Sequence, residues 1–172
     1  MGVWCCRITI DTHQMKIKKG RHSYFHIPML NFGSSVSKTF TFNSPIEHDL
    51  GYPDQLDWNK LFGVAFIPTK HTNSYRIAWR YVPTTKQIEL GAYYYQKGVL
   101  YKDLSLGFIS TNTPYKGVIS YSNGTVTFSI YKDNVPFSSL SVQGKWQFIG
   151  WKLYPYFGGN KPAPIDISIK ID

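Results

Sequence analysis

The chain ends in a strict alternation of isoleucines with polar residues over 165–172, IDISIKID. Successive side chains of a β-strand point to opposite faces of its sheet. The segment therefore predicts a strand with one face on an apolar core and the other face in water. Such a strand needs a second apolar layer to cover its core face, so this ending favours a β-sandwich.

The run from Trp146 to Tyr154 is apolar on both faces and predicts a strand inside a sheet, with Trp146, Phe148, Lys152 and Tyr154 on its outer face. It is joined to the last strand by a segment with two glycines and three prolines, which allows a turn and then an extended chain.

The remaining segments show the same kind of signals. Ser74–Val82 and Gln87–Tyr95 each place four apolar side chains on one face, and Asn123-Gly124 between two such runs predicts a type I′ hairpin. We also expect strands at Val3–Asp11, His13–Lys19, His22–Leu30, Ser34–Phe42, Leu61–Pro68, Tyr115–Tyr121, Thr125–Tyr131 and Val135–Val142. About a dozen short strands at this spacing predict an all-β fold, an antiparallel two-sheet sandwich of the jelly-roll kind, with residues 1–172 as a single domain.

The composition sets limits on partners. The net charge is +9, and the densest basic run lies between Lys16 and Arg21. Such a charge attracts polyanions, but no nucleic-acid-binding motif accompanies it, so nucleic acid is not the expected partner. No apolar run reaches the ~20 residues of a membrane span, so no membrane partner is expected. The first residues lack the pattern of a secretory signal peptide, so we expect a protein that acts in the cytosol, or that leaves the cell by lysis or inside a particle.

Candidate functional residues are those that face away from the core on the clearest strands. They carry arginine, tyrosine, one glutamate and one lysine, and they are Arg76, Arg80, Glu89, Tyr93, Tyr95, Tyr131, Lys152 and Tyr154. If their strands share a sheet, three interpretations remain open. The face could stack sugar rings, contact another subunit, or form ordinary cross-strand pairs.

No catalytic, metal or cofactor site is predicted. The only two glutamates, Glu47 and Glu89, lie far apart in the sequence, whereas glycoside hydrolysis needs two placed carboxylates. Asp54 and Asp57 lie in a loop, where capping of a helical turn is the expected role of Asp54. The histidines are scattered, and no nucleophile or nucleotide motif is present.

The layout resembles a known family. The paired segments WRYV and IELGAYYY, the SNG hairpin and the closing PAPIDISIKI resemble a concanavalin A-like (laminin G-like) jelly roll. The segment YPYFGGNKPAP is similar to the C-terminus of small lectin-like proteins of Bacteroidetes and their crAss-like phages. The calcium-site carboxylates usual in this fold have no counterparts here.

The resemblance implies a non-catalytic structural or binding module, a decoration or attachment subunit of a bacteriophage capsid or tail. Its partners would be other virion proteins or further copies of itself. The alternative is a carbohydrate-binding module that recognises glycans through its aromatic and arginine-bearing face. A glycan-degrading enzyme is the third interpretation.

Overall fold

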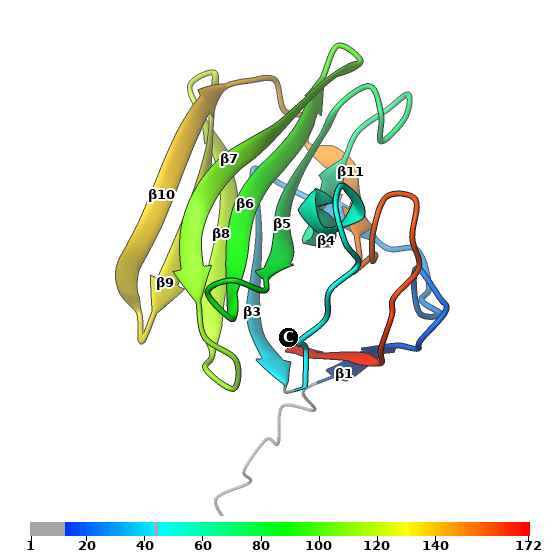
Figure 1. Ribbon diagram of the computed structural model, residues 1–172. Helices are drawn as coiled ribbons and strands as arrows, with labels where there is room; N and C mark the ends of the chain where they lie inside the picture. The colour runs from blue at the N-terminus through cyan, green and yellow to red at the C-terminus, as the bar shows by residue number, and fades with distance from the viewer. Residues whose placement is uncertain (1–12, 44) are drawn as a thin grey trace, which may run out of the picture.

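The computed structural model describes residues 13–43 and 45–172 (Figure 1). The strand expected at Val3–Asp11 lies outside the described residues. Within the described part, the chain forms two six-stranded antiparallel sheets and a single 3₁₀ turn, η1 (Asp54–Leu56). The fold is an all-β sandwich, as the alternation patterns predict. None of the described residues belongs to a helix long and apolar enough to span a membrane.

Each sheet mixes strands from distant parts of the chain. Sheet A has the order β1 (His13–Ile17), β12 (Ile167–Ile171), β3 (Ser35–Asn43), β8 (Tyr115–Ser122), β9 (Thr125–Lys132), β10 (Val135–Gln143). Sheet B has the order β2 (Leu30–Phe32), β11 (Ile149–Leu153), β4 (Asn59–Ala65), β5 (Ser74–Val82), β6 (Gln87–Gln96), β7 (Val99–Ile109). Figure 1 shows the C-terminal strand β12 beside β1, and β12 pairs with β3 on its other side.

The core lies between the two sheets and is rich in aromatic rings. Ile167, Ile169 and Ile171 are buried in it, which confirms the inward face expected for the C-terminal strand. From sheet B, Tyr75 stacks on Trp146 with ring centroids 5.9 Å apart. Trp146 therefore turns inward, and it does not join the outer face on which the sequence placed it.

The Asn123-Gly124 hairpin forms as predicted. Both residues have positive φ, 47° and 78°, and Ser122 pairs with Thr125 across the turn. A type I′ turn needs positive φ at both central positions, which asparagine and glycine tolerate.

Two local expectations were wrong, and one strand was missed. His22–Leu30 is irregular, and pairing begins only at Leu30 with the short edge strand β2. The helical turn at Asp54–Leu56 exists, but Pro53 is its N-cap and no side chain caps it. The long edge strand β7 was not predicted, because two register shifts against β6 and its exposed position remove any clean alternation.

Candidate functional site

The outer face of sheet B carries the candidate site. Cross-strand pairing aligns Leu153, Gly63, Arg76 and Tyr93 in one row across β11, β4, β5 and β6. Lys60, paired with Ala78, lies in the next row that points to the same face of the sheet. Because directly opposed residues share a face of the sheet, Arg76, Tyr93 and Lys60 are neighbours on one surface.

Gly63 makes room for the arginine. A Cβ atom at this position would overlap the carbonyl oxygen of Tyr75 and lie 2.8 Å from the Arg76 Cα. Without that Cβ, the Arg76 side chain lies low on the sheet, and the residue is 7% exposed. The sheet thus holds a guanidinium almost within its surface.

Loops from other parts of the chain turn this surface into a groove of about 370 Å³. One wall is the segment after β11, with Tyr154 and Tyr156, and the other is the turn before β5, with Lys70 and His71. Tyr156 is tied to the sheet by paired backbone hydrogen bonds with Lys60, at 2.8 and 3.0 Å.

Two histidines contact the tyrosines of this wall. The ring of His22 stacks on Tyr156 at 5.3 Å, and the ring of His26 lies 4.3 Å from Tyr154. The Tyr154 hydroxyl donates a hydrogen bond to the carbonyl oxygen of Ile27 at 3.1 Å. These contacts fix the positions of the two tyrosine rings that line the groove.

The floor of the groove is cationic and has no acidic partner. None of the described residues that line it is an aspartate or glutamate, whereas Lys60, Lys70 and Arg76 all line it. Burial, followed by the nearby charge of Arg76, lowers the pKa of Lys60 from its ordinary 10.5 to about 8, and Asp57 partly offsets this. Burial likewise lowers the pKa of Arg76.

Tyr93 lies between the two cations. The Lys60 Nζ is 4.8 Å from the Tyr93 ring centroid, and the Arg76 Cζ is 5.8 Å from it. Burial raises the pKa of the Tyr93 hydroxyl, with the neighbouring Tyr95 adding to the effect. Tyr93 therefore stays a neutral phenol at physiological pH, and its ring offers a negative π face to both cations.

His71 lines the groove next to Lys70. Its ring meets Tyr95 edge-on at 5.2 Å. Burial and the nearby charges of Lys70 and Arg76 lower the pKa of His71, so that the imidazole is neutral at pH 7 and becomes charged only in acid.

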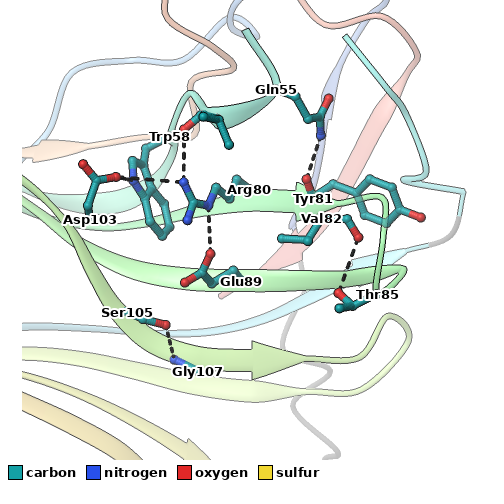
Figure 2. Close-up of polar contacts among 11 residues, drawn as sticks. Gln55, Trp58, Arg80, Tyr81, Val82, Thr85, Glu89, Asp103, Ser105 and Gly107 are labelled. Carbon is teal, nitrogen blue, oxygen red and sulfur yellow. Dashed lines mark hydrogen bonds and ion pairs between the residues drawn. The ribbon is translucent and has the colours of Figure 1, made fainter. Parts of the chain in front are cut away.

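Arg80 and Glu89 share this face but are occupied by each other (Figure 2). The Arg80 Nε donates to the Glu89 carboxylate at 2.8 Å, and its Nη1 donates to the Leu56 carbonyl oxygen at 3.3 Å. The guanidinium lies 4.4 Å above the Trp58 ring, whose Nε1 donates to Asp103 at 2.7 Å. This cluster closes one end of the face and leaves little donor capacity for a ligand.

The structure brings together only part of the predicted set. Arg76, Tyr93, Lys152 and Tyr154 line the groove, and Tyr95 lies beside it. Tyr131 lies on β9 in sheet A, so the expectation that it shares this face is wrong. Strand alternation gives the direction of a side chain but does not reveal which sheet the strand joins.

Lys152 also departs from its predicted orientation. It pairs with the core-facing Val64, so its strand position is inward, and Trp151 and Leu153 take the outer face instead. The cause is Gly150, where a Cβ would lie 2.6 Å from the Val64 side chain. If the strand were shifted by one residue, a bulky side chain would take the place of Gly150 and clash with Val64. The glycine therefore fixes which residues of β11 face inward.

Sequence reasoning missed Lys60, Lys70, His71 and Tyr156. A lysine within the apolar run 58–66 was the one available signal for Lys60. The other three come from loops whose position is set by long-range pairing.

The carboxylates of the described residues do not gather into a metal-binding cluster. Among the described residues, no three His, Cys, Asp or Glu side chains come close enough to hold a metal ion. Glu47 accepts a hydrogen bond from the Ile46 amide at 3.0 Å, and Glu89 binds Arg80.

Comparison with known proteins shows the fold. No family model matches the sequence, and no curated protein matches it. Among solved structures, an alginate lyase from Klebsiella pneumoniae is similar at a TM-score of 0.56 and 9% identity, over 81% of this chain and 58% of the lyase. The chain thus spans little more than half of that enzyme's length.

Two phage proteins are also similar. The CBM2 module of the evolved Dit of Lactobacillus casei BL23 phage J-1 matches at a TM-score of 0.50 and 9% identity, over 91% of this chain and 66% of the module. Tailspike protein 2 of an Escherichia coli O157:H7 bacteriophage matches at 0.47 and 10% identity, over 91% of this chain and 24% of the tailspike. The fold is that of a lectin-like β-sandwich, which carbohydrate-binding, carbohydrate-cleaving and phage proteins share.

Proposed function

We propose that the chain is a non-catalytic glycan-binding module and that its ligand lies in the groove on the outer face of sheet B. The observation that carries the proposal is the cationic, tyrosine-walled groove over Arg76. Sugar sites combine aromatic rings that stack on pyranose faces with a few placed polar groups, and this groove has both. Its volume, about 370 Å³, accommodates a short oligosaccharide segment.

The absence of catalysis is part of the proposal. Glu47 and Glu89 are both engaged in hydrogen bonds outside the groove. Lys60, the basic group on the floor, donates to the carbonyl oxygens of Trp58 and Gly158 at 2.7 and 3.3 Å, so its ammonium is held as a donor. A base must present a free lone pair to the proton it removes, and this geometry does not offer one.

A glycan array followed by calorimetry on the hits tests the binding proposal. We expect binding that is lost in Tyr156→Ala and kept in Tyr131→Ala, the matched tyrosine on the other sheet. Incubation of the protein with each hit should release no reducing ends and no unsaturated sugars. Failure to bind any glycan would refute the proposal, and product release would replace it with an enzymatic one.

A second candidate function, an attachment or decoration subunit of a phage particle, is favoured by an exposed apolar surface at the edge of sheet B. Register pairs Phe32 with Ile149 and Leu30 with Trp151, and all four are exposed. Further exposed apolar residues flank these strands, namely Phe25, Ile27, Met29 and Phe148. Apolar surface of this extent is typical of protein contacts.

The two functions are compatible, because the groove and this edge are different parts of sheet B. The similar module in a phage Dit protein and the sequence resemblance to lectin-like proteins of crAss-like phages support this second proposal. Mass spectrometry of phage particles purified from the source culture should find the chain in a fixed ratio to a capsid or tail protein. Its absence from the particles would exclude a virion role.

A further inference from the structure

Arg76 is a buried cation whose hydrogen-bonding capacity is largely unused. Its Nε is fully buried and has no hydrogen-bond partner. Its Nη2 makes only two long contacts, each 3.5 Å, to the Lys70 carbonyl oxygen and the Ser74 hydroxyl. Buried charged groups are normally paired with an opposite charge and hydrogen-bonded, so an unpaired buried guanidinium indicates a binding site for an anion.

Nothing within the described chain supplies that anion. Arg76 forms no ion pair with any described residue. The residue directly opposite it on β6 is Tyr93, whereas an acidic residue at that position would neutralise the guanidinium. Lys60, on the other side of the Tyr93 ring, adds a second positive charge. Asp57 is close enough to raise the pKa of Lys60, but its single negative charge faces the two cations Lys60 and Arg76, so the floor keeps a net positive charge.

We propose that the groove binds the carboxylate of a uronic acid residue in an acidic glycan, with Arg76 and Lys60 as its charge partners. This inference rests on the proposed glycan-binding function and names its ligand class. A guanidinium is a planar fork of N–H donors that matches a carboxylate, and Arg76 lines the groove. The Tyr154 and Tyr156 rings stand beside the floor, where a pyranose ring that carries the carboxylate would lie against them.

The arrangement also argues against a nucleic acid. A phosphate backbone presents repeated charges and is bound by a track of lysines and arginines. Here Arg76 and Lys60 lie on either side of the Tyr93 ring and form one cationic centre, and one wall of the groove consists of tyrosines. One carboxylate per bound sugar satisfies that centre.

The test uses oligosaccharides that differ only at the carboxyl group. Tetramers of galacturonate and of mannuronate are titrated into the protein by calorimetry, in parallel with the same tetramers after reduction of each carboxyl to a primary alcohol. We expect at least one uronate tetramer to bind and its reduced form to lose at least tenfold in affinity. Dextran sulfate serves as a polyanion without carboxylates.

Variants connect the effect to the groove. Arg76→Gln should weaken uronate binding by about ten- to a hundredfold, since a hydrogen-bonded charge pair is lost. Arg76→Lys should recover part of this, because it keeps the charge but not the fork. Lys60→Met provides a second test that does not depend on the folding of the Arg76 variants. Lys116→Gln, an exposed site on sheet A, is the matched control and should bind normally.

The outcomes separate this inference from the function on which it rests. Equal binding of the acidic and reduced tetramers, or equal binding by Arg76→Gln, overturns the carboxylate assignment and leaves glycan binding intact. The same holds if only neutral glycans bind, or if dextran sulfate competes as well as the uronates. Absence of binding to every glycan refutes both.

Discussion

Lys60 should lower the stability of this fold at neutral pH, and the size of the effect follows from its depressed pKa. In the unfolded chain the ammonium has its ordinary pKa of 10.5, and in the folded protein the pKa is about 8. At about 1.4 kcal/mol per pH unit, this gap means that the charged form costs the fold about 3 kcal/mol. The cost is fully present below pH 8 and is relieved as the pH rises from 8 to 10.5, because the unfolded chain then holds more protons.

Lys60→Met removes this charge and keeps a side chain of similar length. The variant no longer bears the cost of burying the charge. It also loses the hydrogen bonds to the Trp58 and Gly158 carbonyl oxygens, which are worth about 1 kcal/mol each. We therefore expect it to be more stable than the parent by about 1 kcal/mol near neutral pH. The difference should shrink by about 2 kcal/mol and change sign as the pH approaches 10.

Urea unfolding followed by tryptophan fluorescence at several pH values measures both curves. The other titrating groups are common to the two proteins, so the difference between the curves isolates Lys60. Lys116→Met, at an exposed position of sheet A, should run parallel to the parent. A parent and Lys60→Met whose unfolding free energies stay parallel over this pH range would refute the argument.

Three further predictions follow from the same geometry. Binding of an acidic glycan should weaken as the pH rises through about 8, where Lys60 loses its charge, and calorimetry across this range should show a flatter profile for Lys60→Met. Ile169→Ala should lower the unfolding free energy by about 2–5 kcal/mol, as a large-to-small change in the core does, whereas Lys170→Ala on the opposite face should change urea unfolding little. Gly91→Ala should cost about 1–3 kcal/mol in the same assay, because its Cβ would lie 2.5 Å from the Trp58 ring and displace it; unchanged stability would mean that the ring moves freely.

The sequence predicted the parts of the fold that depend on local pattern. The C-terminal isoleucines, the Asn123-Gly124 turn and the pairing of β5 with β6 all follow from neighbouring residues. The pairing of Arg76 with Tyr93 could be predicted for the same reason, because a short hairpin fixes the register between its two strands.

What the sequence could not give depends on contacts between distant segments. Tyr131 has the same alternation whichever sheet β9 joins, so its strand order had to come from the structure. The run around Lys152 is apolar on both faces, so Gly150 is its only residue that indicates which face points to the core. The tyrosine wall is placed by the bridge between Lys60 and Tyr156, which no local pattern encodes.

Two arginines on β5 show what distinguishes the groove from ordinary sheet surface. Arg80 and Arg76 lie on the same face of the same strand, and each has one directly opposed residue on β6. For Arg80 that residue is Glu89, and the pair is closed within the protein. For Arg76 it is Tyr93, so a guanidinium of equal charge and greater burial is left without an acid. A sandwich could stabilise itself with a second glutamate at that position. The tyrosine leaves the guanidinium without a counterion in the described part of the chain, and the carboxylate of the proposed ligand would supply that charge.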